Sequence, residues 1–169
     1  MRTYAWARRY DQALAQYQQA IDLDPTFAVT HERLAHLYAD LGRFSEAIVE
    51  ESRARTLTGE DAQLVRSHDE ALSNAVSAHG SAGYWRTQLD FATGRPNPPE
   101  AYDDAFGIAI IYARLGEKQK AIDSLESTYA ERTIVMSEIG IEPAFDTLRS
   151  EPRFQALLRR VGLEREIPR

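Results

Sequence analysis

The sequence predicts an all-α fold, a solenoid of stacked helix-turn-helix hairpins with closing helices at its C-terminal end. The main observation is that the sequence resembles itself at an offset of 34 residues, which superposes Tyr4 on Tyr38. A second offset, of 74 residues, superposes the segments 38–42 and 112–116, which differ at one residue. Self-similarity at a fixed period of this length is typical of arrays in which each unit buries its neighbour.

The two offsets divide the chain into successive copies of one unit. Because 74 exceeds two units of 34 by six residues, a diverged copy of about 40 residues lies between the two clear ones. We place most of the extra length in the run 94–99, since its closely spaced prolines cannot continue a helix. Within one domain, we therefore expect a partial repeat at 1–25, repeats at 26–59, 60–99 and 100–133, and a C-terminal cap at 134–169.

The apolar spacing explains why each unit forms a pair of helices. In the second copy, Leu34, Tyr38 and Leu41 recur at spacings of four and three, so they share one face of a helix. The small and apolar positions of the following helix are Phe44, Ala47, Ile48 and Ala54. The expected buried positions of the last closing helix are Phe154, Leu157, Leu158 and Val161. A single hairpin cannot bury such a face, so successive hairpins stack and leave one concave side.

Capping residues predict where the helices begin and end. We expect Asp24 to cap the first helix of the second copy, with Pro25 in its first turn, where a missing N–H costs nothing. Gly42 should end that helix in the left-handed conformation. Residues 141–162 read as two short closing helices, of which the second is capped by Ser150 and stopped by Gly162.

Composition excludes several classes of protein. The chain has no cysteine, which excludes disulfide scaffolds and thiolate metal sites. Its 26 acidic residues outnumber 20 basic ones, so we expect no nucleic acid partner. No apolar run is long enough to span a membrane, and the first residues lack the apolar core of a secretion signal. We therefore expect a cytoplasmic protein without a membrane partner.

The repeated positions resemble those of the tetratricopeptide repeat (TPR) family, whose unit is a 34-residue helix-turn-helix. The first copy supplies Tyr4, Ala13, Tyr17, Ala20 and Pro25, and the second supplies Leu34, Tyr38, Gly42, Phe44, Ala47 and Ala54. The match covers residues 1–58 and 102–130, whereas 59–101 match poorly. His31, Glu51 and Gly59 depart from the bulky apolar, aromatic and proline residues of the family pattern. The resemblance implies a surface that binds a protein or peptide.

The C-terminal half carries a second resemblance. Residues 83–86, 112–132 and 145–154 look like the TPR regions of multidomain bacterial signalling proteins, including Ser/Thr kinases, winged-helix regulators and adenylate cyclases. This resemblance implies a regulatory module whose output domain lies elsewhere. The first copy begins in mid-helix, so we expect Met1 to mark a cut in a longer chain.

No motif for catalysis, metal binding or cofactor binding emerges from the sequence. His31 and His36 are five residues apart, so they point about 140° apart on a helix and cannot share an ion. His68 and His79 are too far apart along their helix to bind one ion. The segment 80–83 lacks the spacing of a nucleophile elbow and reads as a turn, and the neighbouring acids at 50–51 and 103–104 read as solvated faces. We expect no enzyme activity, no metal and no cofactor.

The basic cluster near the C-terminus consists of Arg149, Arg153, Arg159 and Arg160. It could bind an acidic partner or phosphate. The alternative is that Arg159 and Arg160 complement the carbonyl end of their helix, and we favour it.

The predicted binding surface is the concave face of the stack. Helix offsets place one group of side chains about 140° from Leu34 and Tyr38 and so toward this face. Its expected members are Arg2, Trp6, Val29, Glu32, Arg33, His36, Asp40, Arg66, Glu70, Asn74, Asp103, Phe106, Ile110 and Arg114. Phe106 and Ile110 could instead pack on the closing helices. Glu32 would repel a peptide carboxylate, which favours a partner peptide of mixed or basic character.

These observations lead to one principal hypothesis and two alternatives. The principal one is a non-catalytic protein- or peptide-binding scaffold or regulatory module, part of a larger bacterial signalling protein. The first alternative is a structural spacer or self-association element, because Tyr4 and Trp6 lie at an open N-terminal edge through which a homodimer could form. The second alternative is an enzyme whose site the linear sequence does not reveal.

Overall fold

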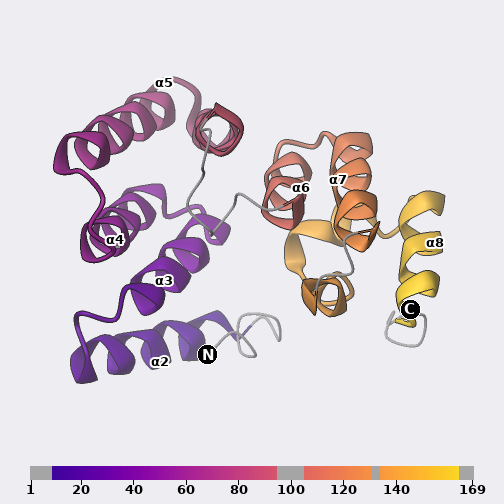
Figure 1. The fold of residues 1–169 in the computed structure, drawn as a ribbon, viewed down its shortest axis with the longest axis horizontal. Coiled ribbons are helices and arrows are strands. Elements are labelled where there is room, and N and C mark those ends of the chain that lie inside the picture. Colours follow the sequence, from indigo (N-terminus) through magenta and orange to yellow (C-terminus); the bar gives the residue numbers. More distant parts are fainter. Residues whose placement is uncertain (1–8, 95–104, 131–133, 164–169) are drawn as a thin grey trace. The chain divides into compact units, whose positions relative to one another are not determined.

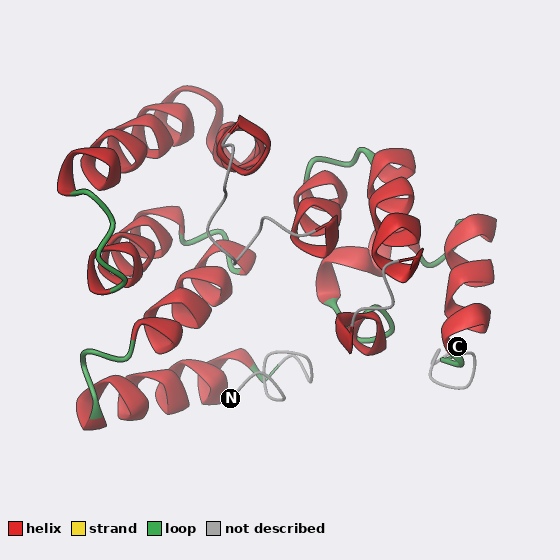
Figure 2. Cartoon of the chain, viewed as in Figure 1, coloured by secondary structure: helices red, strands yellow, loops and turns green. Residues whose placement is uncertain are grey.

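The computed structural model describes residues 9–94, 105–130 and 134–163, and in these ranges every regular element is a helix (Figures 1 and 2). The all-α, TPR-like solenoid class predicted from the repeat is therefore confirmed. The chain forms two compact units, 1–87 and 88–169, and the boundary falls inside one long helix.

The first unit is a series of helical hairpins. Its helices are α2 (Tyr10–Leu23), α3 (Ala28–Asp40), α4 (Phe44–Leu57) and α5 (Ala62–Gly94) as far as Thr87. The core between α2 and α3 is formed by Ala13, Tyr17, Leu34 and Leu37, all nearly inaccessible to solvent. Ala47 on α4 has no exposed surface, and a residue this small lets the helices approach closely.

Glycine ends the first helix of the hairpin in both clear copies. Gly42 has φ of 72° and Gly116 has φ of 75°, a left-handed conformation that costs little without a Cβ. The next amide closes the turn in each case, with Arg43 N donating to Tyr38 O at 2.8 Å and Glu117 N to Tyr112 O at 2.9 Å. The predicted stop at Gly42 is confirmed, and the 74-residue offset superposes two turns of the same geometry.

The predicted start of α3 is wrong. Asp24 is not its N-cap, because α3 begins at Ala28 after Phe27. The carboxylate of Asp24 instead accepts hydrogen bonds from the backbone N–H and the hydroxyl of Thr26, at 2.9 and 2.7 Å. Such a local turn competes with capping, so the chain turns through Pro25 before the helix starts.

Helix α5 consists of two arms that meet at Gly80, whose φ of 57° and ψ of −138° are not helical. The turn that the sequence predicts at 80–83 is found at Gly80, whereas residues 81–83 are helical. A Cβ added at Gly83 would lie 2.1 Å from the carbonyl oxygen of Ala75, so only glycine lets the arms come this close. The ring centroid of Tyr84 lies 4.7 Å from that of Phe44, which packs the second arm against α4.

The second unit contains two more hairpin helices and the C-terminal cap. Its elements are α6 (Ala105–Arg114), α7 (Lys118–Ala130), the 3₁₀ helices η1 (Ile134–Glu138) and η2 (Pro143–Leu148), and α8 (Pro152–Val161). Their core is Phe106, Ala109, Ala113, Ala121, Ile122, Leu125, Met136, Ile139, Ala144, Phe145, Leu148, Phe154, Leu157 and Leu158. The predicted buried face of α8 is confirmed, with Val161 packed at the edge of this core.

The ends of α8 were predicted with mixed success. Gly162 has φ of 85° and stops the helix, as expected. Ser150 is not the N-cap, because that position is taken by Glu151. Pro152 is the first helical residue, and a proline forces the residue before it into an extended conformation, which Glu151 adopts. None of the helices described here combines the length and the apolar character that a membrane span requires.

Candidate functional site

Helix α3 carries the best described part of the predicted concave face. Val29 is exposed, and Glu32, Arg33, His36 and Asp40 are half-buried along one side of the helix. Glu32 Oε1 and Arg33 Nη1 lie 3.9 Å apart, at the limit of an ion pair. A half-buried row of mixed charge can bind a polar chain without exposing a large apolar surface.

The third copy contributes three exposed residues on the first arm of α5. Arg66, Glu70 and Asn74 are spaced by four, so they lie along one side of the arm. All three are exposed, as a binding surface requires. Whether this side and that of α3 form one groove stays a prediction, as do the boundaries of the copies.

The expected contribution of the fourth copy needs correction. Phe106 is buried, and its ring meets that of Phe145 edge to face with centroids 5.6 Å apart. Ile110 packs against the same core, so the alternative of packing on the closing segment is confirmed for both residues. The C-terminal cap packs against this apolar face of α6. Arg114, in the last turn of α6, is half-buried, while Arg2, Trp6 and Asp103 lie outside the described residues.

A buried polar pair crosses the α3–α4 hairpin and was missed by the sequence reasoning. His31 is 2% exposed, and its Nδ1 lies 2.6 Å from Oε2 of Glu50. Its Nε2 lies 3.0 Å from the carbonyl oxygen of Pro25, which can only accept, so Nε2 carries a hydrogen. Glu50 also accepts from Arg53 at 3.0 Å. The expectation that the acids at 50–51 form a solvated face is wrong for Glu50, because a buried histidine requires a polar partner.

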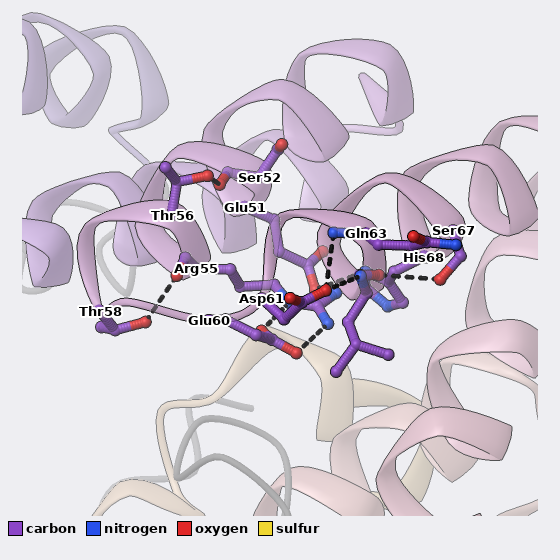
Figure 3. Close-up of polar contacts among 11 residues, drawn as sticks. Glu51, Ser52, Arg55, Thr56, Thr58, Glu60, Asp61, Gln63, Ser67 and His68 are labelled. Carbon is purple, nitrogen blue, oxygen red and sulfur yellow. Dashed lines mark hydrogen bonds and ion pairs between the residues drawn. The ribbon is translucent and has the colours of Figure 1, made fainter.

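A second polar network joins α4 to the first arm of α5 (Figure 3). Arg55 makes a bidentate ion pair with Glu60, with nitrogen–oxygen distances of 2.5 and 2.7 Å. Glu51 Oε1 lies 3.8 Å from Nδ1 of His68, whose side chain is 3% exposed. The repeat register expected from the sequence has an aromatic residue at position 51, whereas Glu51 takes part in this polar network.

Burial and charge shift two pKa values in this network. Desolvation by burial raises the pKa of Asp69 above 3.8, although a hydrogen bond from Ser52 and the charge of Arg55 lower it. For Arg55, desolvation by burial lowers the pKa. The hydrogen bonds to Glu60 and the negative charges of Glu60, Glu51 and Asp69 raise the pKa by more than burial lowers it. The net pKa of Arg55 is raised above its ordinary value, so Arg55 stays a cation that neutralises part of this acidic cluster.

The side chains of these two polar clusters contact one another within the first unit. Across the described ranges, no three histidine or acidic residues are placed to hold a metal ion. The carboxylates of Glu50 and Glu60 are engaged by neighbouring side chains on α3 and α4. We therefore assign both clusters to structure.

The basic cluster of the second unit is used within that unit. Arg153 donates to Asp123 at 2.7 Å, to Glu126 at 2.8 Å and to Gln119 at 3.1 Å, and so holds α8 on α7. These contacts raise the pKa of Arg153, with the hydrogen bond to Glu126 as the largest cause. The other internal contacts are those of Arg149 with Asp146 and the Gly140 carbonyl, and of Arg160 with the Tyr129 ring. This geometry favours the structural interpretation of the cluster.

Comparison with known proteins agrees with the repeat architecture. A family model described as a TPR repeat matches residues 9–42. This segment contains α2 and α3, and it crosses the boundary that the 34-residue offset places between the first two copies. Searches of curated proteins and of solved structures gave no match. The family match supports the TPR family, whose repeats generally serve as protein-interaction modules.

Proposed function

We propose that this protein is a non-catalytic scaffold that binds a protein or peptide segment through the concave face of its TPR-like helices. The observation that carries the proposal is the TPR match over α2 and α3, because α3 bears the mixed-charge row Val29, Glu32, Arg33, His36 and Asp40. Arg66, Glu70 and Asn74 on α5 extend the proposed surface.

The charge of α3 indicates the kind of partner. Glu32 is acidic and half-buried at the position where some family members hold a peptide carboxylate with a lysine. A carboxylate terminus would be repelled there, so we propose a partner segment of mixed or basic character, bound away from its C-terminus. Self-association without a ligand is the competing function, since the solenoid could equally serve as a spacer.

We further propose that the module is cytoplasmic and regulatory, and that it belongs to a larger bacterial signalling protein. The resemblance of the segments 83–86, 112–132 and 145–154 to such proteins motivates this proposal. A regulatory module would transmit partner binding to an output domain elsewhere in the longer chain.

Affinity capture with matched variants tests the binding surface. The variant Glu32→Lys with His36→Glu changes the formal charge by +1 and rearranges charge on α3, and Gln16→Lys makes the same net change on the exposed side of α2. Proteins captured from the source lysate by the native chain and by Gln16→Lys, but not by the α3 variant, would support the proposal. Equal capture by all three would refute the assigned surface. A concentration-dependent dimer without a captured partner would favour self-association.

A further inference from the structure

A row of exposed apolar side chains follows the turns that connect successive repeats of the first unit. Leu23 is 88% exposed and Phe27 is 55% exposed on either side of the α2–α3 turn. Leu57 is 40% exposed and Leu64 is 54% exposed on either side of the α4–α5 turn. Leu23 and Leu57 are one 34-residue period apart. We call these four residues the turn-edge row.

The two turns lie on the same edge of the unit. Successive helices of stacked hairpins run in opposite directions, so every second turn falls on the same edge. Figure 1 shows the α2–α3 and α4–α5 turns on one side of the first unit and the α3–α4 turn on the other. The Phe27 N–H donates to the carbonyl of Asp24 at 3.4 Å, which closes the first turn and brings its flanking residues together.

The surroundings of the turn-edge row are acidic. Between Arg9 and Arg33 the sequence has no lysine or arginine. Two acids, Asp22 and Asp24, flank the first turn.

Hydrogen bonds from neutral groups hold the carboxylates at both turns. Asp22 accepts from Gln18 at 3.0 Å, Asp24 accepts from Thr26, and Asp61 accepts from the backbone N–H groups of Gln63 and Leu64. Hydrogen bonds from Thr26 also lower the pKa of Asp24, so it is ionised at neutral pH. In the described part of the chain no base pairs with these three acids.

We infer that the turn-edge row docks a partner segment that presents apolar side chains flanked by lysine or arginine. Four exposed apolar side chains offer the area for burial, and three carboxylates select for the opposite charge. The nearest bases do not cancel this field: Arg53 and Arg55 are paired with Glu50 and Glu60, and Arg66 lies about 200° around α5 from Leu64. This surface is separate from the proposed concave face and could act with it or without it.

Titration of the isotope-labelled full chain with defined peptides tests the inference by NMR. The probe is a 14-residue helical peptide of leucine and lysine, and the controls are a leucine and glutamate peptide and a serine and lysine peptide. We expect saturable amide shifts at 22–27 and 57–64 with the first peptide only. Shifts confined to other residues, no binding, or equal binding of either control peptide would overturn the inference.

Matched variants separate the turn-edge row from other surfaces. Leu23→Ser with Phe27→Ser should weaken binding of the leucine and lysine peptide by about tenfold or more, whereas Val49→Ser, which removes another exposed apolar side chain, should not. Asp22→Asn with Asp24→Asn should weaken it several-fold, but Glu70→Gln should not. The Glu32→Lys with His36→Glu variant should bind unchanged, so failure of the concave-face proposal would not be confused with failure here. A dimer that forms through the row without peptide would assign it to a second copy and overturn the inference.

Discussion

Replacing His31 by leucine tests the account of the α3–α4 hairpin. Leucine restores the bulky apolar residue of the family pattern, and a simple view of repeat packing predicts a gain in stability. We expect a loss instead, because Glu50 would be left 8% exposed without its histidine partner. The carbonyl of Pro25 would also lose a hydrogen bond, which is 3.0 Å long in the native protein.

The magnitude follows from the contacts that remain. A buried charge without any partner costs about 3–5 kcal/mol. Glu50 keeps Arg53 at 3.0 Å, and the Arg53 side chain is 57% exposed, so the loss in the single variant should be smaller. We expect His31→Leu to lower the free energy of unfolding by about 1–3 kcal/mol. Adding Glu50→Leu removes the orphaned carboxylate and should recover much of that loss.

A double-mutant cycle measures the coupling between the two residues. Urea unfolding of the native chain, both single variants and the double variant is followed by circular dichroism at one pH. We expect a coupling free energy of about 1–2 kcal/mol between His31 and Glu50. Additivity within about 0.3 kcal/mol, or a His31→Leu variant more stable than the native chain, would refute the reasoning.

Two further predictions concern α5. Gly83→Ala should lower the free energy of unfolding by about 1–3 kcal/mol because its Cβ would lie 2.1 Å from the Ala75 carbonyl oxygen, whereas Gly94→Ala meets nothing within 4 Å and should be neutral in thermal melts. Asp69→Asn tests the effect of burial on the pKa of Asp69, which is raised in the folded protein. A raised pKa means that this group contributes its full stability below pH 3.8, and that the contribution is lost as the pH rises through the folded-state pKa. The variant should therefore be at least as stable as the native chain at pH 7, with the difference disappearing in unfolding curves near pH 3.5. A variant clearly less stable at pH 7 would show that the Asp69 charge is net favourable.

The sequence predicts the elements whose signals are local and repeated. Gly42 and Gly162 end their helices as expected, since a left-handed C-cap depends on one residue and its immediate turn. The two predicted N-caps, Asp24 for α3 and Ser150 for α8, are wrong because several nearby residues compete for each capping position. At α3 the Asp24 side chain bonds within its own turn, and at α8 the constraint from Pro152 moves the cap to Glu151.

The site residues were harder to predict because their environment depends on partners far along the chain. Helix offsets treat Phe106 as part of a groove, but the cap folds back and covers it with Phe145. Glu50 looks like a surface acid until His31, 19 residues earlier, is placed opposite it. The departure of His31 from the apolar residue of the family pattern could have indicated this pair, since a polar residue in a packed position requires a polar neighbour.

The dissociation constant of a captured partner is the decisive measurement for a binding site on the concave face of α3. It should be measured by calorimetry for the native chain, for Glu32→Lys with His36→Glu, and for the Gln16→Lys control, with melting temperatures recorded for each. We expect binding weakened by about tenfold or more in the α3 variant alone, with an unchanged melting temperature. Equal affinity of all three proteins would contradict a binding site on this face of α3.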